Sequence, residues 1–381
     1  MKKILQFLFL VVIGFIITFT ILAYHYFPKG VIVLQPIGGM GNQMFQYAAA
    51  YSLSKSTVGK LRVLINETSD LKGNNNPLER NHALSQFQIP QEQISYDTPV
   101  LRFIIKVLTR IKPISSILGI TDIDESNFME YQGKHDSNRF VMRSYFESEE
   151  FFVEYRDEIR KIFNIDSTKY ASSLGLNKQD IESRVNVLKL SESVCVHVRL
   201  GDFAGLLSIP IDYQVKAMDL AKKIIPGVKF YVFSDDIKLA QRELGNNADI
   251  EFFNRPDSSP MEDFYLMSKC SNNINSNSTY SWWTSYLNLK DDRLIIAPYP
   301  RFSDESLVKS LDTQFVDIVL NRVNGNKKLN VWRKVINGEK NFPKNWVLIH
   351  HLESPIKIST GDLKILDLCA DGSFRNGLCF K

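Results

Sequence analysis

The sequence predicts an α/β protein with two parallel-sheet domains, preceded by one N-terminal transmembrane helix. Three observations predict this fold: an uncharged apolar run at the amino terminus, a glycine-rich turn between a strand and a helix near residue 38, and a regular alternation of strands and helices from residue 193 onward. Strands and helices that alternate with short links are typical of parallel sheets with right-handed crossovers.

The first segment is expected to be an uncleaved membrane anchor. Residues 1–3 form a short tail whose Lys2 and Lys3 favour the cytoplasmic side, and Ile4–Tyr24 carries no charged side chain over about the 20 residues that cross a bilayer. A signal peptide has a shorter apolar core and a small-residue cleavage site. The sequence therefore predicts a single-pass type II protein with its folded part in a lumen. Leu101–Ile120 is also apolar, but basic residues interrupt it, so one or two amphipathic helices fit better than a second span.

Composition and cysteine content limit the class of protein. The 381 residues are 44% hydrophobic and 23% charged, as in an ordinary globular protein, and a net charge of +4 is too small to indicate a nucleic-acid partner. Cys195 and Cys270 are expected to be small buried thiols. Cys369 and Cys379 could close a small disulfide loop in an oxidising lumen, with two free thiols as the alternative.

The N-terminal domain, residues 31–185, opens with a strand, a glycine-rich turn and a helix. Asn42 is expected to cap that helix. Gly38, Gly39 and Gly41 lack the spacing of a dinucleotide fingerprint and no P-loop lysine follows, so the turn indicates only that backbone comes close to a ligand or to a neighbouring helix. The expected elements are strands at 31–35, 61–66 and 139–143 and helices at 42–56 and 149–163, and within 67–137 only the amphipathic helices of 101–120 are assigned.

The C-terminal domain, residues 190–310, shows the most regular pattern, and residues 311–381 form an extension of unknown role. The expected strands are 193–200, 228–234, 249–254, 273–276 and 294–297, and the expected helices are 213–225, 238–244, 261–271 and 279–289. Both domains are therefore expected to be Rossmann-like.

His197 and Arg199 form the first candidate site. They alternate with valines, which places both side chains on one face of a strand, about 7 Å apart, just before a Gly201-Asp202 turn. Ligands of open α/β sheets bind at the carboxyl ends of strands, and a guanidinium there suits a phosphate. The alternative is that both residues are ordinary surface groups.

Asn275–Trp283 is the second candidate site. Hydroxyls of Ser278, Thr279 and Ser281 lie where a strand gives way to a helix, and a helix start offers unpaired N–H groups to an anion. The alternative is ordinary N-capping.

Five motifs together resemble those of the alpha-1,2-fucosyltransferases, glycosyltransferase family 11. They occur in the order Gly38–Ala48, Ser144–Ser148, His197–Phe203, Phe230–Asp236 and Asn275–Trp283. The resemblance implies a GT-B-like fold in which two Rossmann-like domains face a cleft. It also implies inverting transfer of L-fucose from GDP-fucose to the 2-hydroxyl of a galactoside-terminated glycan, without metal or cofactor, in the Golgi lumen.

The resemblance also implies roles for individual residues. Arg199 would hold the β-phosphate of GDP, His197 would lie near the guanine or ribose, and Asp202 would brace the motif. Asn42 would approach the phosphate–fucose bond from the other domain, so Arg199 and Asn42 are the expected catalytic residues, with the base unassigned. The remaining donor-binding candidates are Gly39, Gly41, Asp235, Asp236, Asn277, Ser278, Thr279 and Ser281.

Other interpretations remain open. The family usually reads H-x-R-R-G-D-Y, whereas this chain has Leu200 and Phe203. One contact to a phosphate or between the domains would then be absent. The alternative of a membrane-anchored sugar-binding protein that has lost catalysis therefore stays open. Fucose transfer to a protein hydroxyl is a further alternative. Asp122-Ile123-Asp124 matches the metal signature of another class of nucleotide-sugar transferases, although it does not visibly end a strand.

Two sequons occur in the chain. Asn66-Glu67-Thr68 is expected to carry an N-glycan. Asn277-Ser278-Thr279 also matches, but its place in the candidate site argues against its occupancy.

Overall fold

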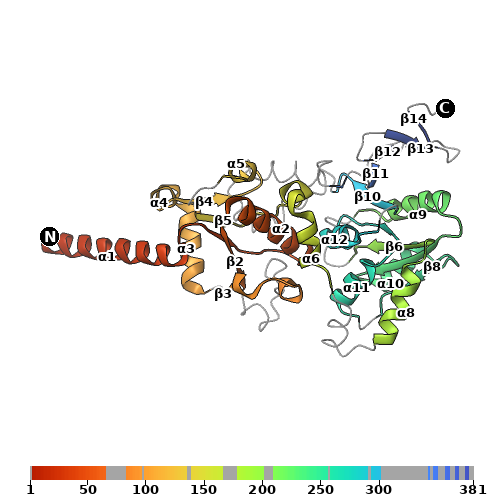
Figure 1. The fold of residues 1–381 in the computed structure, drawn as a ribbon, viewed down its shortest axis with the longest axis horizontal. Helices are drawn as coiled ribbons and strands as arrows, with labels where there is room; N and C mark the ends of the chain where they lie inside the picture. The colour runs from red at the N-terminus through yellow and green to blue at the C-terminus, as the bar shows by residue number, and fades with distance from the viewer. Residues whose placement is uncertain are drawn as a thin grey trace. The chain divides into compact units, whose positions relative to one another are not determined.

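The computed structural model describes residues 2–65, 83–96, 98–134, 139–165, 178–200, 209–255, 258–290, 293–301, 342–343, 346–350, 357–360, 365–368 and 374–376. The chain divides into two compact units (Figure 1). The first comprises Met1–Phe146 and Phe151–Ile162, and the second comprises Glu147–Glu150 and Phe163–Lys381. The change of unit near Ile162 falls earlier than the expected 185–190, since helix α8 (Lys178–Leu188) packs on strand β6 and helix α11 of the second unit.

The first unit begins with a long apolar helix. Helix α1 spans Lys2–Tyr26, two residues beyond the expected run, and Gln6–Tyr26 is long and apolar enough to cross a membrane. In the described part of the chain it is the one helix that meets this criterion. The other apolar stretch forms two shorter helices, α3 (Pro99–Arg110) and α4 (Lys112–Ile117), as expected for amphipathic segments.

A parallel sheet forms the centre of the first unit. Its strand order is β3-β2-β1-β5-β4, and helix α2 (Met40–Thr57) connects β1 to β2. This part of the chain is therefore an α/β unit with a parallel sheet, the coarser part of what the sequence predicts. The strands are β1 (Val31–Leu34), β2 (Lys60–Ile65), β3 (Ile94–Tyr96), β4 (Ile120–Ile123) and β5 (Arg139–Met142).

Two local expectations for this unit are wrong. Residues 149–163 do not form one helix: they form the 3₁₀ turns η4 (Glu149–Phe151) and η5 (Val153–Tyr155), followed by α6 (Arg156–Ile162). Asp122 and Asp124 do lie at a strand end, because β4 finishes at Ile123 before the short helix α5 (Phe128–Tyr131). Two further 3₁₀ turns are η2 (Ala83–Gln86) and η3 (Gln91–Gln93).

The second unit is built on a larger sheet with a parallel centre. Among the described strands the order is β14-β13-β12-β11-β10-β9-β6-β7-β8, parallel from β11 to β8 and antiparallel from β11 to β14. The strands are β6 (Ser193–Val198), β7 (Lys229–Ser234), β8 (Ile250–Phe252), β9 (Asn272–Ile274), β10 (Ile295–Tyr299), β11 (Val347–His350), β12 (Lys357–Thr360), β13 (Ile365–Leu368) and β14 (Phe374–Asn376). The helices in the described part of this unit are α8, α9 (Asp212–Ile224), α10 (Ile237–Leu244), α11 (Pro260–Met267) and α12 (Thr279–Leu287).

The central strand β6 is buried along its whole length. All six of its residues are covered, and Val194, Val196 and Val198 share a core with Ala217 and Ala221 of α9. The strand ends at Val198 rather than Leu200, so Arg199 lies just beyond it. Burial on both faces is typical of a parallel strand with helices on each side.

Part of the expected C-terminal extension belongs to this sheet. Strand β11 continues the parallel ladder from β10, with Ala297 opposite Leu348. The ring of Trp346 lies 5.5 Å from that of Trp282 in α12, so this segment closes over the helix.

The expectation that Cys195 and Cys270 are free thiols is wrong. Cys195 of β6 and Cys270, just before β9, form a disulfide rather than two buried thiols, with Cα atoms 6.0 Å apart. Parallel pairing of β6 with β9 brings the two residues together across 75 positions of sequence. Cys369, Cys379 and Asn66 lie outside the described residues, so the second disulfide and the glycan stay predictions.

Candidate active site

His197 joins the end of β6 to the start of α12. Its side chain is 4% exposed, its Nδ1 lies 2.8 Å from Ser276 Oγ, and its ring stacks on Tyr280 at a centroid distance of 5.5 Å. Ser276 follows β9 and Tyr280 belongs to the first turn of α12. The carboxyl ends of two neighbouring parallel strands therefore meet at this imidazole.

The environment of His197 keeps the imidazole neutral. Burial, followed by the nearby Arg199 cation, lowers the pKa of His197 to about 4, against a smaller opposite effect of Asp235. A neutral imidazole has one nitrogen that donates and one that accepts. With Nδ1 engaged by Ser276, His197 can present one polar group without adding charge to the site.

Arg199 is held by a carboxylate from the neighbouring strand. Its Nη1 lies 3.2 Å from Oδ2 of Asp235, which follows β7, and the two side chains are 17% and 23% exposed. The other carboxylate oxygen of Asp235 accepts a 2.8 Å hydrogen bond from the backbone N–H of Leu200. Asp235 thus fixes both the guanidinium and the chain that follows it.

Leu200 and Asp236 have structural roles in this arrangement. The Leu200 side chain packs against the core of the second unit, where the usual second arginine of the motif would place a charge. Asp236 caps α10 by accepting a 3.0 Å bond from the N–H of Leu239. Of the two adjacent aspartates, Asp235 is therefore the one that contacts Arg199. Asp202 lies outside the described residues.

The loop between β9 and α12 is organised by its own hydroxyls. Ser276 Oγ accepts from Ser278 N–H at 3.1 Å, and Ser278 Oγ caps α12 by accepting from Tyr280 N–H at 3.2 Å. Ser281 is fully buried and donates to the Ser278 carbonyl at 3.1 Å. Ser278 and Thr279 are partly exposed at the helix start, so of these hydroxyls they are the ones a ligand can reach.

A buried ion pair between Arg301 and Glu147 stabilises the loop between β9 and α12. Arg301 donates to the carbonyl of Asn277 through Nε at 3.3 Å and Nη2 at 3.0 Å, and its Nη1 lies 2.8 Å from Oε2 of Glu147. Both charged side chains are about 5% exposed or less. Burial raises the pKa of Glu147, and Arg301 opposes that rise. Asn277 is itself buried, which is consistent with an unglycosylated sequon.

The glycine-rich loop of the first unit is clamped by two glutamines. Gln46 accepts from Ile37 N–H and donates to Ile37 O, both at 2.8 Å, while Gln43 donates to Gly38 O at 2.9 Å. Neither side chain is predicted as functional from the sequence, although both lie within the Gly38–Ala48 motif. A side chain amide that bonds both groups of one residue leaves the loop backbone little freedom.

The expected N-cap of α2 is wrong. Gly39 is the capping residue, since it is extended (ψ 176°) and the helix begins at Met40, so Asn42 and the buried Gly41 lie within the first turn. Gly38 has φ +78°, and a Cβ there would lie 2.7 Å from Asn42 Nδ2. The loop thus folds so that Asn42 covers Gly38.

The D-x-D tripeptide has a local structural role. Asp124 is 7% exposed, and its Oδ1 accepts from both the N–H and the hydroxyl of Ser126, while its own N–H donates to Asn127 at 2.9 Å. These bonds form the turn between β4 and α5.

The neighbouring Glu125 carboxylate accepts hydrogen bonds from Ser144, Tyr145 and Phe146, and burial raises its pKa.

Comparison with known proteins decides the family. Residues 80–315 match the model of glycosyl transferase family 11. The chain belongs to glycosyltransferase family 11. It is accordingly a glycosyltransferase.

Named relatives of this family 11 enzyme come from bacteria and mammals. It is 30% identical to the O-antigen biosynthesis glycosyltransferase WbnK of Escherichia coli, over 71% of this chain and 95% of that one. It is 25% identical to an alpha-1,2-colitosyltransferase of Escherichia coli, over 73% and 94% of the two chains. It is also 25% identical to galactoside alpha-(1,2)-fucosyltransferase 2 of Rattus norvegicus, over 71% and 70%.

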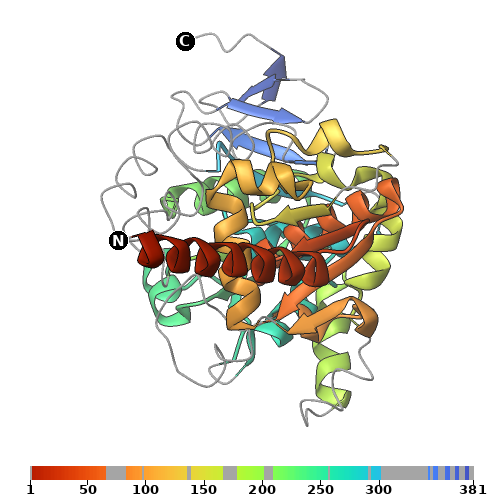
Figure 2. The same ribbon diagram turned by 90° about the vertical axis from the view of Figure 1, so that its left-hand side faces the viewer.

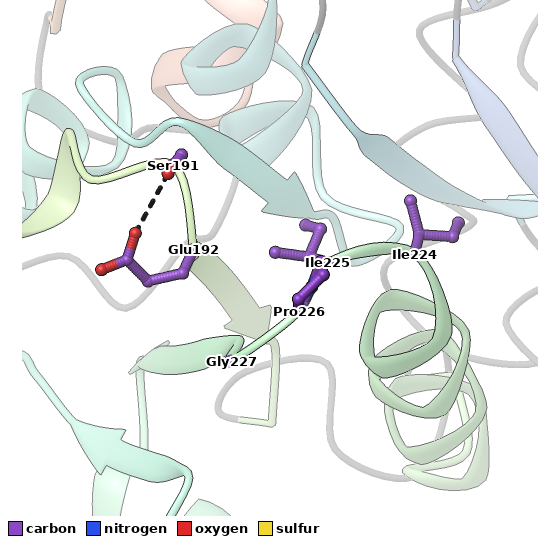
Figure 3. A pocket seen from close by; sticks show the side chains of 6 residues that line it. All are labelled: Ser191, Glu192, Ile224, Ile225, Pro226 and Gly227. Carbon is purple, nitrogen blue, oxygen red and sulfur yellow. Dashed lines mark hydrogen bonds between the residues drawn. The ribbon is translucent and has the colours of Figure 1, made fainter.

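The family 11 enzyme also has a hollow away from these residues. It measures about 410 Å³ and is lined by Ser191, Glu192 and Ile224–Gly227 (Figure 3). These residues precede β6 and β7, whereas His197 and Arg199 lie at the carboxyl end of β6. The hollow is therefore at the opposite end of the sheet from the candidate active site.

Proposed function

We propose that the enzyme transfers L-fucose from GDP-fucose to the 2-hydroxyl of a galactoside, with inversion and without a metal ion. The observation that carries the proposal is the convergence of Arg199, neutral His197 and the Ser278-capped start of α12 within one unit. The names of the fucosyl- and colitosyltransferase relatives support the reaction class and the α1,2 linkage.

The diphosphate of the donor would bind between Arg199 and the start of α12. A guanidinium binds phosphate oxygens through parallel charge-assisted hydrogen bonds. A helix start contributes N–H groups and the positive end of the dipole, and the exposed hydroxyls of Ser278 and Thr279 add donors. Asp235 already holds the guanidinium in one orientation. Binding of the phosphate would therefore cost little further side-chain entropy.

The nucleoside and the sugar would occupy the two sides of this diphosphate. His197 offers an uncharged polar group to the ribose or guanine, and Asp235 is the aspartate beside it, since Asp236 is engaged in capping α10. Asn42, with Gly39 and Gly41 in the loop of the first unit, is proposed to approach the phosphate–fucose bond. The clamp by Gln46 would keep that loop preorganised.

The chemical step requires stabilisation of the departing GDP. Negative charge grows on the β-phosphate as the bond to the anomeric carbon of fucose breaks. Arg199 and the α12 start can stabilise that charge in place of a cation, because preorganised donors act strongly in a partly dehydrated site. The galactoside 2-hydroxyl attacks the opposite face of fucose and loses its proton to a base that is not assigned to a residue.

Anchoring in a membrane is part of the same proposal. Helix α1 would cross the bilayer with Lys2 and Lys3 on the cytoplasmic side, which follows the positive-inside rule. The enzyme would then be a type II protein whose catalytic part lies beyond the membrane. The Golgi lumen stays a prediction.

The proposal is tested with the full chain in detergent, GDP-fucose and a panel of β-galactosides. We expect a fucosylated product whose α1,2 linkage is established by NMR of the purified glycan. A folded-protein acceptor included in the panel separates glycan transfer from protein O-fucosylation. Donor binding with neither transfer nor hydrolysis, or fucose attached to another hydroxyl, would contradict the proposal.

A further inference from the structure

The last two turns of α1 are packed into the first unit. Phe19, Ala23 and Phe27 are buried in one apolar cluster with residues of α3, among them Leu101 and Ile104. On the other side of the helix Ile21 is 63% exposed. The end of the apolar helix therefore has one side against the protein and one side open to its surroundings.

Two arginines hold the carboxyl end of α1 in place. Arg139 donates from Nε to Phe27 O at 2.5 Å and from Nη1 to Leu118 O at 3.2 Å, and its guanidinium lies 4.7 Å from the ring centre of Tyr24. Arg62 donates to Tyr26 O at 3.3 Å. Cations at a helix carboxyl end also interact favourably with its dipole. The helix is thus held against the rest of unit 1 by specific contacts rather than by a flexible stem.

The length of the apolar helix determines the depth at which α3 lies. Gln6–Tyr26 has 21 residues, which is about 31 Å of helix and close to the hydrocarbon thickness of a bilayer. Phe19 lies about 10 Å before the end of that span. If the whole span is in the bilayer, the part of unit 1 that covers Phe19 must enter the interfacial layer. If unit 1 stayed in water, only Gln6–Thr18, about 20 Å long, would remain for a core of about 30 Å.

Helices α3 and α4 have the composition of an interfacial surface. Beside its buried stripe, α3 exposes Val100 (45%) and Phe103 (50%), followed by Ile111 (44%) and, in α4, Ile117 (81%). Residues 98–121 contain four basic side chains and no acidic one. An apolar face bordered by basic residues is typical of helices that lie about 5–10 Å deep in the headgroup region.

The arrangement of these helices is consistent with one surface. Helix α3 contacts α1 and α4, and Figure 1 shows it running across the end of α1, with α4 beside it on the side of unit 1 from which α1 extends. In Figure 2 the same helix passes behind α1 at a steep angle. We propose that α3 and α4, with the last two turns of α1, bind the interfacial layer of the bilayer that α1 crosses and fix the rest of unit 1 against the membrane. This inference rests on the proposed anchoring by α1.

Tryptophan scanning of the full chain tests the proposal. The chain is reconstituted in phosphatidylcholine–phosphatidylglycerol vesicles, with and without lipids brominated just below the headgroups. Phe103→Trp and Ile117→Trp report on the proposed surface, and both sites are exposed enough to accept an indole. Met129→Trp, at a 48% exposed apolar site on α5, is the matched control, and Phe9→Trp reports on insertion of α1.

The four variants give separable outcomes after the wild-type emission is subtracted. We expect the added emission of Phe103→Trp and Ile117→Trp to lose most of its intensity with brominated lipid, while that of Met129→Trp is unchanged. Quenching of an indole introduced at position 9 by the same brominated lipids, without quenching at positions 103 and 117, would overturn the surface and leave the anchor intact. Absence of quenching at all four positions would overturn the anchor and the surface together.

Discussion

Arg199 Nη1 lies 3.2 Å from Oδ2 of Asp235, so the main cation of the candidate active site is oriented by a carboxylate from the adjacent strand. If this guanidinium stabilises the β-phosphate, Arg199→Ala should lower the rate by two to three orders of magnitude, or about 3–4 kcal/mol of transition-state stabilisation. Arg199→Lys should recover part of the loss, since an ammonium lacks the planar fork. Initial rates of fucose transfer measure both effects.

The same assay distinguishes this mechanism from a metal-dependent one. Activity should persist in EDTA, and Asp124→Ala should retain it, because Asp124 forms the turn after β4. Activity lost to EDTA and to Asp124→Ala, yet intact in Arg199→Ala, would refute the proposed role of Arg199.

Substitutions of the adjacent Asp235 and Asp236 should have different effects, one on catalysis and the other on stability. Asp235→Asn removes the ion pair with Arg199 and should lower kcat/KM for GDP-fucose with little change in Tm. Asp236→Ala removes the cap of α10 and should cost about 1 kcal/mol of stability without changing kcat/KM. Steady-state kinetics and thermal unfolding of the two variants test this; the reverse pattern would assign the Arg199 contact to the wrong aspartate.

Acid should destabilise the enzyme through His197. Its pKa is about 4 when folded and about 6.5 when unfolded, so the unfolded state binds more protons between these values. This contribution to stability is complete above pH 6.5 and decreases, by up to about 1.4 kcal/mol per pH unit, as the pH falls toward 4. Unfolding midpoints should therefore fall less steeply with acid in His197→Asn. Equal slopes for variant and wild type would contradict the neutral, buried imidazole.

The buried pair Glu147–Arg301 should show a characteristic double-mutant pattern. Each single replacement, Glu147→Leu or Arg301→Met, leaves one buried charge and should cost about 3–5 kcal/mol. The double variant should be more stable than either single variant. Because Arg301 also holds the carbonyl of Asn277, donor KM should stay raised in the double variant. Additive losses in chemical denaturation would argue against a coupled pair.

Two glycines with positive φ provide a matched test of the first-unit loop. Gly38 and Gly30 have φ of +78° and +72°, so alanine at either should cost about 1–2 kcal/mol. A Cβ at Gly38 also meets the Asn42 side chain, whereas one at Gly30 meets nothing within 4 Å. Gly38→Ala should therefore lower kcat and Gly30→Ala should not. Equal kcat in the two variants would argue against a role for Asn42 in the reaction.

Local patterns predicted most of the fold and part of the site. Strands β6, β7 and β10 are predictable from the sequence because each is a short run rich in apolar residues, and the segments between them contain recognisable helical patterns. His197 and Arg199 were found because they interrupt such a run at its end. Their contacts with Asp235 depend on β6 and β7 being neighbours in the sheet. The alternation of residues within one strand does not reveal which strands are neighbours.

The missed features depend on contacts that no local pattern encodes. Asn42 resembles an N-cap in sequence, but the extended backbone of Gly39 begins the helix earlier. Glu147 and Arg301 are 154 positions apart, and neither lies in a run that marks it as buried. The Gln46 clamp could have been suspected, since a glutamine on a buried helix needs a polar partner.

Because of the disulfide between Cys195 and Cys270, the stability of this chain depends on which side of a membrane it folds. It closes a loop across 75 positions from within β6, the strand that carries His197, and a bond over a loop of that size stabilises a fold by on the order of 4 kcal/mol. Such bonds persist in oxidising compartments and are reduced by the thiol pools of the cytosol. Enzyme produced in a reducing cytosol would therefore be a less stable protein of identical sequence, and the choice of expression compartment becomes a variable in every stability measurement on it.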